Sequence, residues 1–304
     1  MSASVIVRVP AKVNVQLAVG AARPDGFHDL ANVFLAVGLY DEVTVTPADE
    51  LRVTCEGPDA DQVPLDVTNL AARAAIALAE RHGTDPAVHL HIAKDIPVAG
   101  GMAGGSADGA GALLACDALW GTHASREELL DICAELGSDV PFSLVGGAAL
   151  GTGRGEQLRT LDVGGDFQWV FAMADRGLST PAVFREFDRL GEGTDIPEPV
   201  ASQPLLDALA KGDPDALAAA VSNDLQPAAL SLFPELADTL AAGRAAGALT
   251  ALVSGSGPTT AFLARDAESA AEVAAALRSS GTCRAVRTAS GPAPGATVVR
   301  ITGA

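Results

Sequence analysis

The stretch PVAGGMAGGSADGAGALL, residues 97–114, joins a glycine-rich run to a helix that we expect to begin around Ser106. Glycine has no Cβ, so it adopts positive φ angles and lets an anion approach backbone N–H groups closely. The N-terminus of a helix adds the positive end of the helix dipole to this attraction. The run therefore predicts a phosphate cradle in which the Ser106 hydroxyl reaches a phosphate or a metal ion. Its glycines are Gly100, Gly101, Gly104 and Gly105.

The same run does not fit two common phosphate-binding templates. No lysine follows the glycines in a G-K-[ST] position, and no G-x-G-x-x-G opens a βαβ unit here. A P-loop and a Rossmann site are therefore disfavoured. Taken alone, the run also fits a flexible Gly-Ala turn before a buried helix, and its length and its position before a helix favour phosphate binding.

Alternating apolar residues on both sides of this run indicate a mostly antiparallel sheet. A break or bulge is expected at Pro10, because proline cannot donate a ladder hydrogen bond. One helix is expected to begin near Thr68 as its N-cap, and another to occupy residues 126–136. Strands are expected at residues 5–9, 13–19, 43–45, 51–55 and 88–92.

The pattern changes past Gly155, where Ala-rich helical segments alternate with short strands. This alternation predicts an α+β second domain, with the boundary between about Gly151 and Asp166. We therefore expect one domain at residues 1–155 and a second at residues 156–304. In the second domain, helices are expected at 214–221, 234–246 and 267–279, and strands at 168–174, 248–253, 260–264, 283–288 and 297–301.

The composition narrows the possible partners. The chain has 304 residues with 20 Lys and Arg against 38 Asp and Glu, a formal charge of −18, so its average surface repels nucleic acid and anionic lipid. A nucleotide is not excluded, because backbone N–H groups act at contact distance, where distant charges are screened.

The amino terminus lacks a signal core, and no segment approaches the roughly 18 apolar residues of a membrane span. Cysteines without a C-x-x-C pair favour a reduced compartment. We expect a soluble cytoplasmic protein, monomeric or homodimeric, with no nucleic-acid or membrane partner.

Two polar positions outside the run are candidates for the chemistry. Lys12, Asn14 and Gln16 share one face of a predicted strand, although a surface sheet explains such a face without any function. Asp139 is either a turn or N-cap aspartate, or a general base that accepts a hydroxyl proton. A base of that kind needs a neighbouring cation to position it and adjust its pKa, and Lys12 is the candidate cation.

A further pair of glycines, Gly255 and Gly257, lies between two apolar strands, in ALVSGSGPT at residues 251–259. Alone it is a tight connection, and it is also placed to close over a nucleotide loop from the second domain. Together, PAKVNVQLAV (residues 10–19), the glycine-rich run and this segment resemble the three ordered motifs of the GHMP kinases. Each motif is weak alone, but three in this order across nearly the whole chain are a strong match.

Two further stretches resemble one branch of that superfamily, the diphosphocytidyl-methylerythritol kinases. ARPDGFHDLANVF (residues 22–34) resembles their G-R-R-x-D-G-Y-H-E-L segment, and LGSDVPFSLVGGAALGTGRGE (residues 136–156) resembles their aspartate motif and the G-R-G-E run behind it. The resemblance implies an α+β fold of two domains. The first is similar to domain 2 of ribosomal protein S5, the second is ferredoxin-like, and ATP meets the substrate in the cleft between them.

The resemblance also implies roles in the ATP-dependent phosphorylation of a small molecule, a cytidine diphosphate-linked methylerythritol. Lys12 and Asp139 are the implied catalytic pair. The implied substrate contacts are Asn14, Phe27, His28, Asp139 and Phe184. The implied ATP loop consists of Pro97, Val98, Ala99, Gly100, Gly101, Met102, Ala103, Gly104, Gly105, Ser106 and Ala107, and Ser106 is the candidate ligand of Mg²⁺.

The chain departs from the family pattern at a few positions, and two alternatives stay open. Phe27 replaces the usual Tyr, which keeps a stacking face but loses the phenol hydrogen bond. Ala107 lacks a hydroxyl that many relatives carry. The first alternative is another GHMP kinase of the homoserine or mevalonate type. The second is a non-catalytic RNA-binding module, against which the acidic charge and the lack of a basic, aromatic-interleaved patch count.

Overall fold

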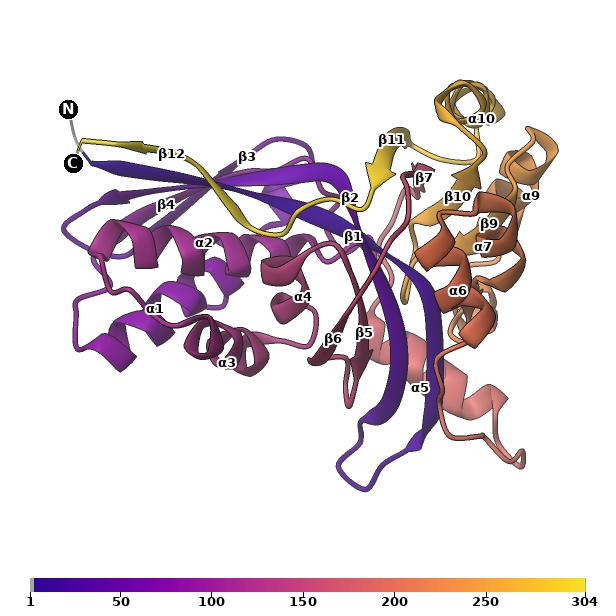
Figure 1. Cartoon of the computed structure of the whole chain (residues 1–304), viewed down its shortest axis with the longest axis horizontal. Coiled ribbons are helices and arrows are strands. Elements are labelled where there is room, and N and C mark those ends of the chain that lie inside the picture. Colours follow the sequence, from indigo (N-terminus) through magenta and orange to yellow (C-terminus); the bar gives the residue numbers. More distant parts are fainter. Residues whose placement is uncertain (1–2, 304) are drawn as a thin grey trace.

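Two long antiparallel strands, β1 (Ser4–Ala22) and β2 (His28–Pro47), are the longest elements of the described structure and pair with each other along most of their length. The computed structural model describes residues 3–303. The strand pair runs along a first unit and bends where it reaches a second unit (Figure 1). The pairing register shifts between Pro10 and Ala11, so the irregularity predicted at Pro10 is confirmed as a bulge-like shift.

The first unit is built on a sheet with the strand order β12-β1-β2-β4-β3, which β5, β6 and β8 join near the bend. Its pairs are antiparallel except for β3 with β4 and β1 with β8, so the predicted mostly antiparallel sheet is confirmed. The other strands are β3 (Arg52–Glu56), β4 (Val88–Ala93), β5 (Ala148–Thr152), β6 (Gln157–Leu161), β8 (Ser222–Asn223) and β12 (Thr297–Thr302).

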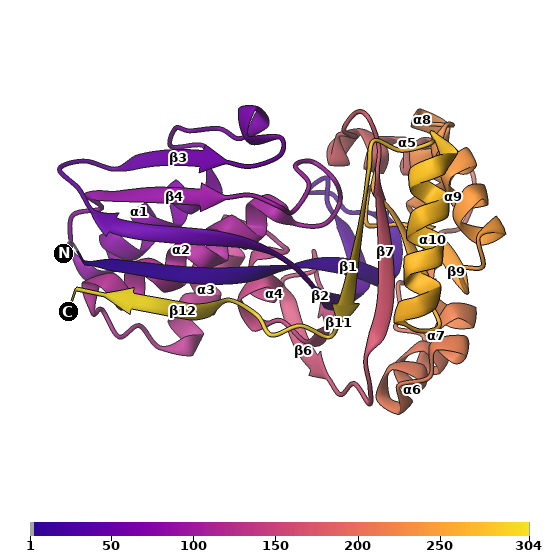
Figure 2. The same cartoon turned by 90° about the horizontal axis from the view of Figure 1, so that it is seen from above.

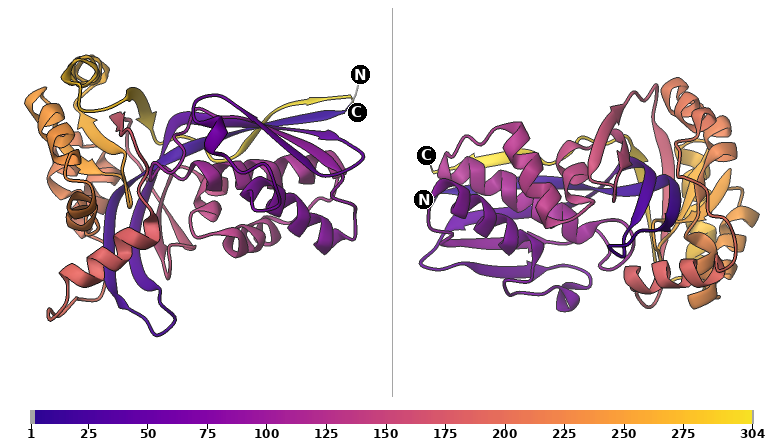
Figure 3. Two further views of the ribbon diagram at one scale, coloured as in Figure 1. Left: turned by 180° about the vertical axis from the view of Figure 1, so that it is seen from behind. Right: turned by 90° about the horizontal axis from the view of Figure 1, so that it is seen from below.

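Helices α1 to α4 cover one face of this sheet (Figure 3). The predicted Thr68 cap is wrong by one residue, because the side chain of Asn69 accepts the hydrogen bond from the N–H of Ala71. The helix expected around Ser106 begins two residues earlier, and the helix expected at 126–136 is confirmed. The bounds are α1 (Leu70–His82), α2 (Gly104–Trp120), α3 (Arg126–Leu136) and α4 (Val140–Val145), with a 3₁₀ turn at Ala60–Gln62.

The second unit is an antiparallel sheet with the order β11-β7-β10-β9. Numbered along the chain, this is the order 4-1-3-2 of a ferredoxin-like sheet, as expected. Helices α9 and α10 pack on the outward face of this sheet (Figure 2), whereas α6 and α7 pack with its other face. The strands are β7 (Phe167–Met173), β9 (Thr250–Val253), β10 (Thr260–Ala264) and β11 (Ala285–Gly291). The helices are α5 (Thr180–Leu190), α6 (Gln203–Lys211), α7 (Pro214–Ala220), α8 (Gln226–Leu232), α9 (Leu236–Ala245) and α10 (Ala267–Ser280).

Strand β7 links the cores of the two units through its alternating side chains. Trp169 and Phe171 pack into the large core that includes β1 and α2, whereas Val170 and Ala172 pack with α9 and α10. Because one strand contributes to both cores, the two units share a packed interface.

The division of the sequence does not follow the sheets. Strands β6 and β12 lie beyond residue 156, yet β6 pairs with β5 and β12 pairs with β1 in the first sheet. The beginning of β1 and the end of β12 consequently lie side by side (Figure 1). The domains at 1–155 and 156–304 stay a prediction, and the first sheet takes strands from both. Within residues 3–303, no helix combines the length and apolar content that crossing a membrane requires.

Helix α2 lies close to the first sheet because Gly111 faces it. A Cβ at Gly111 would lie 2.7 Å from Val9 Cγ2 and 2.9 Å from Val43 Cγ2. We expect Gly111→Val to lower the free energy of unfolding by about 1–3 kcal/mol through overpacking. Gly105→Ala is the control, since its Cβ would meet only Leu70 Cδ1 at 3.8 Å. Equal urea midpoints for Gly111→Val and the unsubstituted protein would contradict this packing.

Candidate active site

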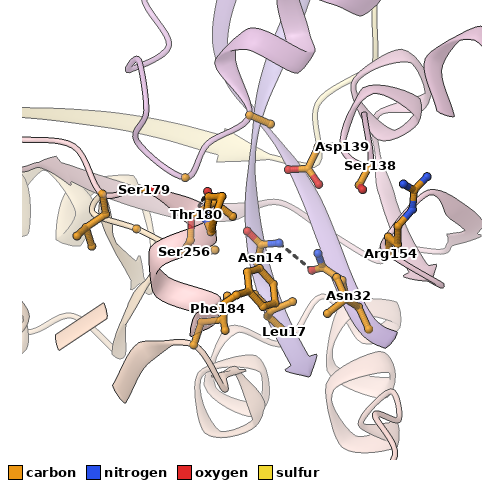
Figure 4. A pocket seen from close by; sticks show the side chains of 18 of the residues that line it. Asn14, Leu17, Asn32, Ser138, Asp139, Arg154, Ser179, Thr180, Phe184 and Ser256 are labelled. Atoms are coloured by element: carbon orange, nitrogen blue, oxygen red, sulfur yellow. Dashed lines mark hydrogen bonds between the residues drawn. The ribbon is translucent and has the colours of Figure 1, made fainter. Parts of the chain in front are cut away.

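A cavity of about 840 Å³ lies between the two units, and both units line it (Figure 4). The first unit contributes β1, β2, the glycine-rich loop and the residues just before α4. The second contributes α5 and the glycine segment around Ser256. The residues predicted to be catalytic or to contact the substrate all line this cavity, and they are Lys12, Asn14, Phe27, His28, Asp139 and Phe184.

The ammonium group of Lys12 is buried at the floor of the cavity and has three close partners. Lys12 Nζ donates to Asn14 Oδ1 at 2.6 Å and to the carbonyl oxygen of Gly101 at 2.9 Å. It lies 3.4 Å from Asp139 Oδ2. A buried charge requires such compensation, because moving it out of water costs several kcal/mol otherwise. The cation and the carboxylate that the sequence placed 127 positions apart therefore form one pair.

Asp139 stands at the N-cap position of α4, but its side chain makes no capping hydrogen bond. Its backbone carbonyl accepts hydrogen bonds from the N–H and the hydroxyl of Ser143. The carboxylate is consequently free to face the cavity (Figure 4). The N-cap alternative is therefore right about the position of Asp139 and wrong about its side chain.

The polar face of β1 is buried, so the surface-sheet explanation is wrong. Asn14 Nδ2 donates to Asn32 Oδ1 at 2.7 Å, which fixes the Asn14 carbonyl toward Lys12. Gln16 binds the segment before α6, since its amide pairs with Val200 O and Ser202 N at 2.8 Å each. Asn32 was not predicted, and its signal was a single amide within the apolar run LANVFLAV of β2.

The glycine-rich loop is held by the third glycine segment. The N–H of Thr259 donates to Gly100 O at 3.2 Å, and the Ser254 hydroxyl donates to Gly101 O at 3.2 Å. Gly101 has φ +75°, and a Cβ there would lie 2.2 Å from Ser254 O. Only glycine permits this approach, so the segment does close against the loop from the second unit, as one of the two alternatives predicted.

The predicted ATP-loop residues fall into three groups. Met102 and Ala107 are fully buried in the core, so their side chains support the loop and do not face the cavity. Pro97 and Val98 line a separate, smaller cavity of about 90 Å³. The remaining residues line the main cavity, and they are Ala99, Gly100, Gly101, Ala103, Gly104, Gly105 and Ser106.

The N-terminus of α2 opens into the cavity. Its N-cap residue, Ala103, adopts a left-handed conformation with φ 62° and has no polar side chain to cap the helix. The first N–H groups of a helix have no intrahelical acceptor, so they are available to an anion. Ser106 lies in this first turn and lines the cavity. The loop thus offers backbone donors and one hydroxyl, the chemistry that phosphate binding requires.

A buried charge cluster lies beneath the loop. Lys94 Nζ contacts Asp41 Oδ2 at 2.6 Å and Asp108 Oδ2 at 2.9 Å. Asp41 Oδ1 accepts hydrogen bonds from the N–H groups of Asp95 and Ile96, just before the loop, while Asp108 belongs to α2, just after it. Burial raises the pKa of the Asp108 carboxyl to about 8, against the opposing pull of Lys94. For Lys94, burial lowers the pKa, but the two carboxylates outweigh it and raise the pKa overall. The cluster anchors both ends of the loop.

Aromatic side chains from both units form another wall of the cavity. The rings of His28 and Phe184 have centroids 5.0 Å apart, and His28 Nε2 lies 2.8 Å from Asp188 Oδ1. Phe27 is 49% exposed, and the Arg154 guanidinium lies 5.2 Å from its ring centroid. Asp188 and Arg154 were not predicted. Arg154 lies within the quoted G-R-G-E run, whereas nothing in the sequence pattern around Asp188 pointed to His28.

Comparison with known proteins agrees with this geometry. The models of the GHMP kinases N terminal domain and the GHMP kinases C terminal match residues 69–147 and 205–283. A Streptomyces avermitilis protein named 4-diphosphocytidyl-2-C-methyl-D-erythritol kinase is 84% identical over 97% of this chain and 100% of its own length. A Mycobacterium tuberculosis protein of the same name is 55% identical over 97% of this chain and 93% of its own length.

Solved structures show the same two-domain fold. A crystal structure of 4-(cytidine 5'-diphospho)-2C-methyl-D-erythritol kinase superposes with a TM-score of 0.76 at 33% identity, over 93% of this chain and 98% of that one. Homoserine kinase from Cytophaga hutchinsonii superposes with a TM-score of 0.74 at 20% identity, over 97% of each chain. At that identity the second likeness concerns the fold alone. The expected two-domain α+β GHMP kinase fold is confirmed.

The raised pKa of Asp108 predicts how stability depends on pH. The native state keeps a proton that the unfolded chain releases near pH 4, so the free energy of unfolding should fall as pH rises from about 4 to 8. Asp108→Asn removes this group, so its free energy of unfolding should fall less steeply with pH. The two slopes should differ by up to about 1.4 kcal/mol per pH unit. Urea unfolding at pH 5, 6, 7 and 8 measures both slopes. Asp131→Asn, at an exposed position of α3, is the control. Identical slopes for Asp108→Asn and the unsubstituted protein would exclude this proton uptake.

Proposed function

This chain belongs to the 4-diphosphocytidyl-2-C-methyl-D-erythritol kinase family of the GHMP kinases, and we propose that the residues lining its cavity transfer a phosphoryl group from ATP to 4-diphosphocytidyl-2-C-methyl-D-erythritol. The acceptor is the 2-hydroxyl, and the products are the 2-phosphate and ADP, within the non-mevalonate route to isopentenyl diphosphate. The Lys12–Asp139 pair beside the glycine-rich loop carries the proposal.

Asp139 is the proposed general base. Its carboxylate is not used for capping and faces the cavity, so it can accept the proton of the substrate hydroxyl. Lys12 holds this carboxylate in place and compensates the charge that develops between acceptor and phosphate. Phosphoryl transfer needs little covalent help from a protein, so positioning and charge compensation supply most of the acceleration.

The glycine-rich loop is the proposed site of the ATP phosphates. Its contribution is the free N–H groups of the first turn of α2, which lie at the cavity wall. Within residues 3–303, no three His, Cys, Asp or Glu side chains are placed to hold a metal ion. We therefore infer that Mg²⁺ would take most of its oxygen ligands from ATP, with the Ser106 hydroxyl as the protein ligand. Such an ion would neutralise charge on the β- and γ-phosphates.

The aromatic wall is the proposed site of the cytidine end. Phe27 and Phe184 offer faces on which a base can stack, and His28 and Asn14 offer hydrogen bonds. Phe27 lacks the phenol of the family's usual Tyr but keeps the stacking face. A homoserine- or mevalonate-type acceptor would leave this wall unused. The RNA-binding alternative gives way to the kinase assignment, while a cytoplasmic location and a monomeric or homodimeric state stay predictions.

Replacing the proposed base tests its role. We expect Asp139→Asn to lower kcat by about 100- to 10,000-fold, because the amide cannot accept the proton. ATP affinity should change little, because the phosphates are proposed to bind the loop. ADP release under saturating substrates and ATP titration measure the two effects. Asp29→Asn, a 59% exposed carboxylate paired with Arg23, is the control and should leave kcat unchanged. Undiminished turnover in Asp139→Asn would refute the assignment.

Replacing Phe27 tests the stacking wall. Loss of base stacking in Phe27→Ala should raise KM for the cytidine substrate by about 5- to 150-fold. The KM for ATP should stay the same, because Phe27 belongs to the other wall. Phe27→Tyr keeps the ring and serves as the control, with KM close to that of the unsubstituted protein. An equal rise of both KM values in Phe27→Ala would indicate general disruption of the cavity and contradict a stacking role.

A further inference from the structure

Few cationic side chains reach the main cavity. Within residues 3–303, the Lys and Arg residues that line it are Lys12, Arg154 and Arg185. Lys12 is already compensated by Asn14, by the Gly101 carbonyl and by Asp139. In a chain with a net charge of −18, an anionic group of the substrate away from the glycine-rich loop therefore depends on one of the two arginines.

The position of Arg154 relates it to both ends of the proposed substrate site. It lies in the turn between β5 and β6, where its N–H donates to Glu156 Oε2 at 2.7 Å. The neighbouring Gly155 is close to the residues just before α4, since a Cβ on Gly155 would lie 3.9 Å from Ser138 Cβ. The guanidinium lies 5.2 Å from the Phe27 ring centroid. Figure 4 shows the Arg154 side chain beside Ser138, the residue before Asp139. Arg154 thus lies close to Phe27, on which the cytosine is proposed to stack, and close to Ser138, the residue before the proposed general base Asp139.

The guanidinium of Arg154 is available to a ligand. Its Nε lies 3.9 Å from Glu156 Oε2, which is beyond hydrogen-bond distance, and no other side-chain acceptor is recorded for it among the described residues. The side chain is 38% exposed, so an incoming anion reaches it without displacing a buried contact. A planar guanidinium presents paired N–H donors that match phosphate oxygens in a bidentate geometry.

These observations assign a partner to Arg154 if the proposed function holds, because that substrate carries a diphosphate between its cytidine and its methylerythritol. We propose that Arg154 binds this diphosphate. The guanidinium then fixes the span between a base stacked on Phe27 and a hydroxyl at Asp139. Arg154 is thereby a substrate-binding residue and a determinant of specificity for diphosphate-linked substrates.

Calorimetric titration with cytidine and with CDP tests this assignment. The titrations are made with the glycine-rich loop saturated by a non-hydrolysable ATP analogue, so that CDP does not occupy it. The unsubstituted protein should bind CDP more tightly than cytidine. Arg154→Met should lose about 10- to 100-fold in CDP affinity, because a hydrogen bond between charged groups contributes about that much to binding. Its cytidine affinity should stay within about threefold of that of the unsubstituted protein. Arg154→Lys keeps the charge but not the planar pair of N–H donors. Its CDP affinity should lie between those of the unsubstituted protein and Arg154→Met.

Arg185→Met is the matched control, because Arg185 lines the same cavity from α5. It should leave the ratio of CDP to cytidine affinity near that of the unsubstituted protein. The inference fails if Arg185→Met carries the diphosphate-specific loss. It also fails if Arg154→Met weakens cytidine and CDP equally, since Arg154 would then act only through its packing on Phe27. An unsubstituted protein that binds neither ligand contradicts the proposed function itself, and the inference with it.

Discussion

The compensation of one buried charge, the ammonium of Lys12, is the constraint on which the site depends. Its partners belong to β1, to the glycine-rich loop and to the start of α4, so a single cation joins three segments that are distant in the sequence. Leaving such a charge uncompensated costs several kcal/mol, which makes any arrangement that separates these segments unfavourable. The same contacts place a carboxylate and an ammonium beside a loop of free N–H groups. The requirement for stability and the requirement for phosphoryl transfer therefore coincide.

The loop itself is held from two directions. The segment around Ser254 and Thr259 binds the carbonyls of Gly100 and Gly101 from the second unit, and the Lys94 cluster anchors the chain on both sides of the loop from below. The Lys94 ammonium is compensated by Asp41 and Asp108, so the proposed phosphate site depends on the backbone N–H groups of the loop. An acidic chain can consequently bind a nucleotide, because the cradle consists of backbone dipoles that are fixed before the ligand arrives.

Sequence alone predicts the parts of this structure that depend on local pattern or on ordered motifs. The alternation of β1, the break at Pro10 and the meeting of Lys12 with Asp139 belong to this group. Partners chosen by tertiary packing could not be predicted: Lys94 and Asp41 lie 53 positions apart, and His28 and Asp188 lie 160 apart. Helix α5 was missed although Val183, Phe184, Phe187 and Leu190 recur at helical spacing, so its apolar periodicity was present in the sequence. The return of β12 to the first sheet likewise depends on an edge of β1 that no local pattern reveals.

The central claim, that this cavity transfers phosphate to a cytidine diphosphate-linked alcohol, is tested most directly by ADP release. The purified protein is given Mg²⁺ and ATP with 4-diphosphocytidyl-2-C-methyl-D-erythritol, and CDP alone replaces that compound in the control reaction. The account predicts ADP release that requires the methylerythritol compound and equals the amount of phosphorylated product. ADP release at the same rate with CDP alone, or no release with either, would contradict it.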